Sequence, residues 1–226
     1  MRRLPRPIFP VRYAIVAGPG KAVKHPFRYL RAIASTVIAF APYRVVVAQA
    51  AVDSTPRAYT AADVRFMTGM IHHHAQAILI AGWAPSHNAS PSVQTLCARI
   101  IVSQNDEIAL IQRWLAHRHQ PVPDLKNSHA MMPEMDPATM MPGMLTAEQL
   151  AALDNARGAE FDDLFLTDMI QHHQGAITMV NQLFAQGAGE ETTVFKFASG
   201  VQVDQATEIA RMQKMLAASL VGTANQ

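Results

Sequence analysis

The chain has 226 residues, of which 50% are hydrophobic and 16% are charged, so it can bury a sizeable core and is neither disordered nor collagenous. Residues 1–50 contain nine of the 19 Lys and Arg residues and no acid, which leaves ten cations against all 17 acids in residues 51–226. A body that acidic is a poor nucleic-acid binder, because phosphate contacts need clustered cations. The single cysteine, Cys97, excludes an internal disulfide framework and a cysteine-rich zinc site.

The first fifty residues have the features of an export signal. Residues 1–31 are basic, residues 32–41 form an apolar run, and the sequence Ala-Gln-Ala at residues 48–50 is a pattern that signal peptidase reads. We therefore expect residues 1–50 to be a signal peptide or other targeting segment, and the mature chain, from Ala51, to be periplasmic or secreted. The alternative is an uncleaved amphipathic anchor. The apolar run is short for a membrane span, and we expect none in the mature chain.

The rest of the chain contains one unit twice. Residues 63–78 align without gaps to residues 162–177 in the frame D-x-x-F-hydrophobic-T-x-M-I-x-H-H-x-x-A-I. Farther on, residues 104–115 match residues 205–216 in the frame Q-x-x-E-I-A-x-x-Q-[RK]-x-L. Each copy is expected to leave an apolar face uncovered, so the two copies should pack on each other.

Helix-start patterns recur along both copies, whereas strand patterns are nearly absent. The helix-start patterns are the capping pairs Thr60 with Asp63 and Thr146 with Gln149, and a Ser90 N-cap followed by Pro91.

Glycines indicate where the predicted helices end. Breaks at residues 82–90 and 187–189 divide each copy into two helices, and Gly158 separates a short helix, 146–157, from a long one, 159–186. We predict an all-α chain, an antiparallel four-helix bundle made of two repeated helical hairpins with pseudo-twofold symmetry.

A connector rich in methionine and proline joins the two copies. Its prolines exclude a long helix, and a connection of this length is usually functional or without fixed structure. Its methionines could wrap a thiophilic ion or form an apolar lid over the bundle, and both readings stay open. They include Met132, Met135, Met141 and Met144. The predicted organisation is a linker at 51–59 and a bundle domain at 60–226, with repeat one at 60–119, the connector at 120–145 and repeat two at 146–221.

Adjacent histidines at the same place in both copies are the strongest candidates for a binding site. On a helix, Met70 shares a face with His73 and His74, three and four residues later, and the second copy repeats this arrangement. Thioether and imidazole together suit Cu(I) and, by the same softness, Ag(I), and they are poor ligands for Mg²⁺ or Ca²⁺. The candidate metal ligands are therefore His73, His74, His172, His173, Met70 and Met169.

Each of these positions has a structural alternative. Methionine at helical spacing is ordinarily core filler, and buried histidines could form a polar network that only supports the fold. Glu107 and Glu208 could orient the histidines instead of binding an ion. His87 lies in a predicted turn and shows no sign of a role. The accessory candidates outside the connector are Met67, Glu107, Glu208, Met212 and Met215.

At these residues the chain resembles the domain-of-unknown-function family 305. The resemblance covers about residues 60–220 and rests on motif, spacing and duplication together. The motif segments are residues 141–146 (Met-Pro-Gly-Met-Leu-Thr), 161–162, 165–166 and 169–176, with 67–77 as the first-copy version. The resemblance implies a ferritin-like four-helix bundle, usually exported, and some members are described as copper- or silver-binding proteins of the cell envelope. It also implies the same six site residues.

The leading hypothesis is an exported metal-binding protein, not an enzyme, that holds Cu(I) or Ag(I) to sequester it or pass it on. Its oligomeric state and any metal-transfer partner stay open. A second hypothesis is a metal-free envelope module with structural or interaction roles. A ferritin-like di-iron oxidase is less favoured, because such sites use Glu-x-x-His and this chain has Met70 and Met169 in place of the glutamates. No catalytic triad, phosphate loop or nucleotide fingerprint is present.

Overall fold

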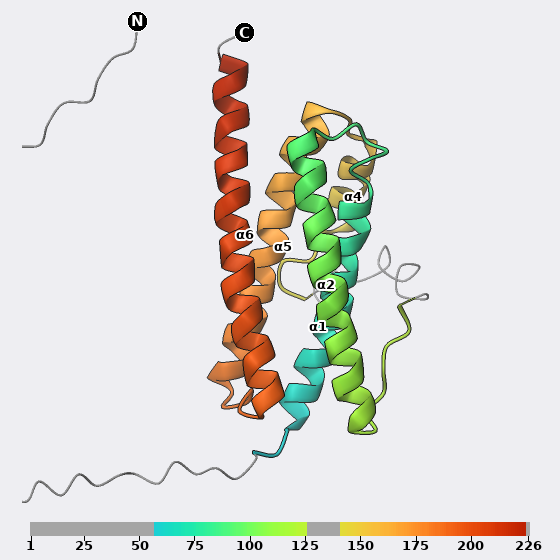
Figure 1. Cartoon of the computed structure of the whole chain (residues 1–226), viewed down its shortest axis with the longest axis vertical. Coiled ribbons are helices and arrows are strands. Elements are labelled where there is room, and N and C mark those ends of the chain that lie inside the picture. The colour runs from blue at the N-terminus through green and yellow to red at the C-terminus, as the bar shows by residue number, and fades with distance from the viewer. Residues whose placement is uncertain (1–56, 126–140, 225–226) are drawn as a thin grey trace, which may run out of the picture. The chain divides into compact units, whose positions relative to one another are not determined.

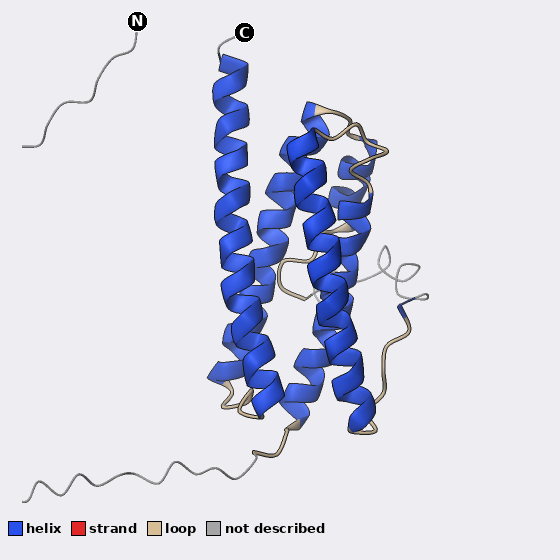
Figure 2. Ribbon diagram, viewed as in Figure 1, coloured by secondary structure: helices blue, strands red, loops and turns tan. Residues whose placement is uncertain are grey.

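The computed structural model describes residues 57–125 and 141–224, so the predicted signal segment and part of the connector, with Met132 and Met135, lie outside the described residues. The described residues contain helices and no strand (Figure 2). The helices are α1 (Ala61–Gly82), α2 (Pro91–His117), α4 (Ala147–Asn155), α5 (Ala159–Ala185) and α6 (Thr192–Ala224). The all-α prediction is therefore confirmed.

The predicted capping residues begin three of these helices. Thr60 Oγ1 accepts from the Asp63 amide at 3.2 Å, and the Asp63 carboxylate accepts from the Thr60 amide at 2.7 Å, so α1 begins with a capping box. The α4 helix begins with the same arrangement between Thr146 and Gln149. Ser90 caps α2, with a proline in the first turn.

Glycines make the two sharp turns around α5. Gly158 precedes α5 with φ +60°, and Gly189, in the turn to α6, has φ +79°. Residues with a Cβ rarely adopt a positive backbone φ, which explains why these turns occur where the sequence has glycine. A Cβ at Gly189 would also lie 2.7 Å from the Phe184 ring.

The four long helices lie side by side as two hairpins (Figure 1). The α1 helix packs on α2, α5 packs on α6, and the two hairpins meet through α1 and α5, with α4 against α5. The start of α1 meets the end of α5, since the Asp63 carboxylate accepts from the Gly189 amide at 2.7 Å. Because the start of one helix lies at the end of the other, α1 and α5 are antiparallel. None of the described helices is long and apolar enough to cross a bilayer.

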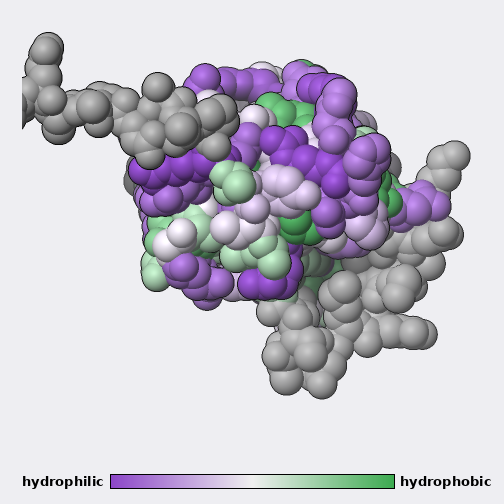
Figure 3. Space-filling model, turned by 90° about the horizontal axis from the view of Figure 1, so that it is seen from below, coloured by the Kyte–Doolittle hydropathy of each residue, from purple (hydrophilic) through white to green (hydrophobic). Residues whose placement is uncertain are grey.

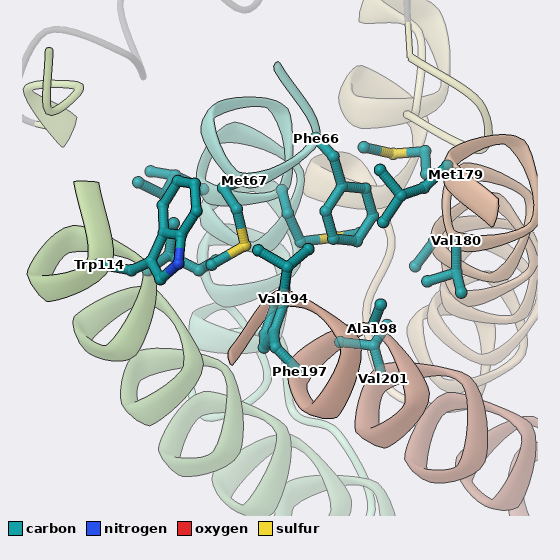
Figure 4. Packing of buried hydrophobic residues seen from close by; sticks show 14 of the residues in the cluster. Phe66, Met67, Trp114, Met179, Val180, Val194, Phe197, Ala198 and Val201 are labelled. Atoms are coloured by element: carbon teal, nitrogen blue, oxygen red, sulfur yellow. The ribbon is translucent and has the colours of Figure 1, made fainter. Parts of the chain in front are cut away.

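Two apolar clusters fill the interior, one toward each end of the helices. The first gathers Phe66, Trp114 and Phe197 with their neighbours (Figure 4), and the second gathers Ile80 and Phe161 with theirs. Along each long helix, the residues of one cluster precede those of the other, and a few polar residues stand between them. A polar layer therefore crosses the middle of the bundle between two apolar regions.

An aromatic and ionic cluster joins the end of α2 to the start of α6. The Arg118 guanidinium lies 4.3 Å from the Trp114 ring centroid, and both side chains bind the Glu191 carboxylate, at 2.9 and 3.1 Å. Seen from one end, the molecule shows mostly hydrophilic surface with smaller hydrophobic patches (Figure 3).

Candidate metal centre

Four buried histidines form the centre of the polar layer. Each is no more than 1% exposed, although histidine carries two polar ring atoms. Two come from α1 and two from α5, at equivalent positions of the repeat. They are His73, His74, His172 and His173. The structure therefore brings together all four histidines that the sequence predicted.

The inner histidine of each pair meets its counterpart across the contact of α1 with α5. The ring centroids of His73 and His172 are 3.9 Å apart, with the planes tilted by 39°. His74 and His173 lie farther out, with centroids 6.4 and 6.3 Å from the inner ring of their own helix. The repeat thus places two imidazoles in contact at the centre and one on each side.

A glutamate from the neighbouring helix holds each outer histidine. His74 Nε2 lies 2.6 Å from Glu107 Oε2, a close ion-pair contact without good hydrogen-bond angles. His173 Nε2 donates to Glu208 Oε2 at 2.7 Å. The glutamate side chains are 17% and 19% exposed, so they connect the buried rings to solvent. A carboxylate on one ring nitrogen is the usual way in which proteins orient a histidine toward a metal through its other nitrogen.

The nitrogens on the other side of these rings lack partners. Among the described residues, Nδ1 of all four histidines has no hydrogen-bond partner, and neither does Nε2 of His172. An unpartnered polar atom in the interior costs about 1–3 kcal/mol, so most proteins avoid it. A neutral imidazole whose Nε2 carries the proton has a free lone pair on Nδ1, which is the form that binds a metal.

Burial keeps the inner histidines neutral. Desolvation is the main cause that lowers the pKa of His73 to about 3, with the neighbouring His74 adding to it and the bond to Pro142 opposing it. Desolvation lowers the pKa of His172 well below its usual value, and the repulsion between protons on His172 and His73 adds to it. No proton has to leave these two rings before they bind a cation at neutral pH.

The end of the connector closes over the inner pair. His73 Nε2 donates to the Pro142 carbonyl at 3.0 Å. The Gln76 side chain bonds to both backbone groups of Leu145, donating to its carbonyl at 3.2 Å and accepting from its amide at 2.8 Å. Residues 141–145, which we call the strap, thus bind the polar layer directly.

Two residues at equivalent positions of the repeat contact the strap in different ways. Gln76 of the first copy provides the hydrogen bonds, whereas Gly175 of the second lets the backbone pass. A Cβ at Gly175 would lie 2.0 Å from the Pro142 carbonyl oxygen. Sequence reasoning missed this contact, because the two residues have different chemistry and the shared motif skips them.

The predicted methionines are distributed differently from the histidines. Met70, Met169, Met67 and Met212 are fully buried within the apolar clusters. Met215 lines a hollow beside Leu166 and Arg211, while Met141 and Met144 belong to the strap. In the described part of the chain, no three His, Cys, Asp or Glu side chains are grouped so that they could hold an ion together. An ion at the centre would therefore have few ligands, or a thioether among them.

Two buried glutamines also belong to the polar layer. Gln104 and Gln205 stand at equivalent positions, three residues before the glutamates, and are 2% and 4% exposed. Both amide atoms of Gln104 and the oxygen of Gln205 lack partners among the described residues. The repeated Q-x-x-E frame contained the signal for them, although sequence reasoning assigned them no role.

Two further residues have structural roles. His87, which sequence reasoning left without a role, is buried, and its Nε2 bonds to the backbone oxygen and carboxylate of Asp154 at 2.9 and 3.1 Å. It therefore ties the α1–α2 turn to the end of α4. Cys97 is buried in the second apolar cluster, and burial, followed by the charge of Asp162, raises its thiol pKa to about 12.

Several solved structures are similar to this one. A putative secreted protein from Streptomyces coelicolor matches with a TM-score of 0.60 and 23% identity, over 70% of this chain and 93% of that one. A fragment from Deinococcus radiodurans matches with a TM-score of 0.58 and 26% identity, over 71% and 99%. CopM in its Cu(II)-bound form matches with a TM-score of 0.56 and 30% identity, over 69% and 95%. CopM was also crystallised in Cu(I)-bound and Ag-bound forms, which match at 28% identity.

Sequence comparison gives one short match and one long match. Uncharacterized protein L153 of Acanthamoeba polyphaga mimivirus is 37% identical over 46 residues, so the chain spans only about 30% of the length of that curated relative. The family model for the domain of unknown function DUF305 matches residues 63–216, which include all four buried histidines. The chain therefore belongs to the DUF305 family.

Proposed function

We propose that this protein binds Cu(I) or Ag(I) through its buried histidines and the methionines beside them, and that it sequesters the ion or passes it on outside the cytoplasm. The observation that carries the proposal is the set of Nδ1 atoms in the polar layer, which are buried and lack partners on all four rings. The copper- and silver-bound forms of the similar protein CopM support the same class of metal ion.

The chemistry of the polar layer suits a soft monovalent cation. The two inner rings are neutral, and the outer two are each held by a carboxylate, so their free nitrogens are oriented before an ion arrives. Cu(I) and Ag(I) accept few ligands and favour imidazole and thioether donors. The apolar clusters on both sides keep water out, and the negative charges of Glu107 and Glu208 offset the charge of the ion.

The same contacts give a second candidate function some support. Hydrogen bonds to Glu208 and Pro142 are also what a structural polar network would contain, so the protein could be a metal-free envelope module. We do not propose an enzyme. A di-iron oxidase would need glutamates three residues before the histidines, where the buried Met70 and Met169 stand.

The deciding experiment is an anaerobic competition titration of Cu(I) on the purified protein. We expect tight binding by the parent and a loss of more than about 100-fold in affinity in the His73→Ala, His172→Ala double variant, because changes to orienting groups alone cost about 10–100-fold. His117→Ala, in the last turn of α2, is the matched control. If the double variant folds and binds Cu(I) as tightly as the parent, the site assignment is wrong.

Export is a separate part of the proposal. Its support is the segregated charge and the Ala-Gln-Ala sequence at residues 48–50. N-terminal sequencing of the protein recovered from outside the cytoplasm should begin at Ala51. A chain that retains its first fifty residues in the cytoplasm would refute this part and leave the metal site untouched.

A further inference from the structure

A small hollow opens on the seam between α1 and α5, beside the strap. Its volume is about 200 Å³. Among its described lining residues there is no carboxylate, imidazole or thiol, and its charged member is Arg65, which is exposed to solvent. The remaining lining is apolar or neutral. It includes Phe66, Gly69, Met141, Pro142 and Met179.

Two thioether side chains converge in this hollow. The point that a Cβ of Gly69 would occupy lies 3.2 Å from Met141 Sδ and 3.5 Å from Met179 Cε. The two side-chain ends therefore lie over the same glycine, one from the strap and one from α5. Figure 4 shows Met179 beside Phe66, at the edge of the first apolar cluster.

The second copy has a larger residue at the position of Gly69. Gly69 corresponds to Asp168 in the second copy, where the side chain is buried and accepts from Gln149 of α4 at 3.3 Å. A glycine in the first copy leaves the space that the two methionines enter. This difference between the copies argues that the hollow is not a by-product of the bundle geometry.

We propose that Met141 and Met179 form a second binding site, made of thioethers, for a soft monovalent cation such as Cu(I) or Ag(I). Thioether sulfur is neutral and polarisable, so it favours such ions, and without a carboxylate or imidazole the hollow discriminates against Zn²⁺, Mg²⁺ and Ca²⁺. Arg65 is exposed to solvent, where water and salt weaken its repulsion of a bound cation.

The site formed by Met141 and Met179, which we call the outer site, lies next to the polar layer. Met141 is followed in the chain by Pro142, whose carbonyl accepts from His73 at 3.0 Å. An ion held by Met141 is therefore one residue from the group that covers the inner histidines. The role of the outer site as an entry point for the buried histidines rests on the proposed function, whereas cation binding by the two thioethers does not.

The test is methyl NMR of the full chain labelled with ¹³C-methyl methionine and titrated with Ag(I). The variants Met141→Leu and Met179→Leu, which keep the side-chain volume, assign the two resonances. We expect both methyl signals to shift together as Ag(I) is added, and the Met179 shift to be lost in Met141→Leu at the same Ag(I) concentration. Gly69→Ala should weaken the shift, because its Cβ meets Met141, whereas Gly200→Ala, where a Cβ meets nothing, should not.

Three results of the titrations of the parent and Met141→Leu would overturn the proposal. They are a Met179 signal that ignores Ag(I), a shift that survives unchanged in Met141→Leu, and an equal shift with Zn²⁺. The His73→Ala, His172→Ala variant separates this site from the buried one. A Met179 shift that persists there supports the outer site even if the histidines bind nothing, whereas its disappearance shows that Met179 reports on the polar layer and refutes the outer site.

Discussion

The rings of His73 and His172 pack against each other with centroids 3.9 Å apart, each contributed by one copy of the repeat. Three of their four ring nitrogens have no partner among the described residues, and both rings are buried. Leaving such atoms unpaired destabilises the metal-free protein, and natural sequences depart from good packing chemistry mostly where a function requires it.

Replacing His172 by leucine should stabilise the metal-free protein. The substitution removes two buried nitrogens that have no partners, and we expect a gain of about 1–2 kcal/mol in the free energy of unfolding. Chemical denaturation in the presence of a chelator measures it. His87→Leu is the control, because His87 is buried with its hydrogen bonds made and its loss should destabilise the protein. A clear loss of stability in His172→Leu would mean that the ring supports the fold.

Gly175→Ala should displace the strap. Its Cβ would lie 2.0 Å from the Pro142 carbonyl oxygen, and the clash is with backbone, which cannot move without breaking the bond to His73. We expect a cost of about 1–3 kcal/mol and faster hydrogen exchange at the Leu145 amide. Gly200→Ala, on an open helix face, should show neither effect. Unchanged protection of Leu145 in Gly175→Ala would contradict this account of the strap.

Removing an orienting carboxylate should weaken metal binding without abolishing it. Glu208→Ala takes away the acceptor that holds His173 at 2.7 Å, and we expect Cu(I) or Ag(I) affinity to fall by about 10–100-fold. A competition titration provides the comparison, with the exposed Glu160→Ala as control. Equal affinities for the two variants would show that Glu208 does not act through His173.

Acid should destabilise the metal-free protein through the inner histidines. Their pKa is about 6.5 in the unfolded chain, but about 3 for His73 and well below 6.5 for His172 in the folded one. As the pH falls below 6.5, these histidines become protonated in the unfolded chain but stay neutral in the folded one. The free energy of unfolding therefore falls by up to about 1.4 kcal/mol per pH unit for each ring. Denaturation curves at pH 7, 6 and 5 test this slope.

Asp168 should oppose this trend over part of the range. Burial is the main cause that raises its pKa from 3.8 to about 6, so between these values the native state binds the extra proton, and this group stabilises the protein as the pH falls. Asp168→Asn should therefore steepen the loss of stability between pH 6 and 4. An unchanged slope in the variant would show that Asp168 titrates normally.

Much of the fold could be read from local chemistry. The pairs Thr60 with Asp63 and Thr146 with Gln149 cap helices where their spacing predicted, because capping involves residues only three apart. The alignment of the two copies also predicted that they would pack on each other, since each is expected to leave an apolar face uncovered. Both inferences depend on periodicity, which the sequence shows directly.

Other contacts could not be read in this way. The sequence offered Met70 and Met169 as ligands beside the histidines; the structure shows that both are fully buried and belong to the apolar clusters, and their role as ligands stays a prediction. The bond from His73 to Pro142 joins two distant segments, and no helical period connects them.

The sequence by itself determined the helices, their caps and the duplication, because each follows from spacing along the chain. Only the tertiary structure decided which ring nitrogens are left without partners, how the strap crosses Gly175 and which methionines face a hollow. Those features depend on the close approach of segments far apart in the chain, where a single missing Cβ or one carbonyl oxygen determines what fits.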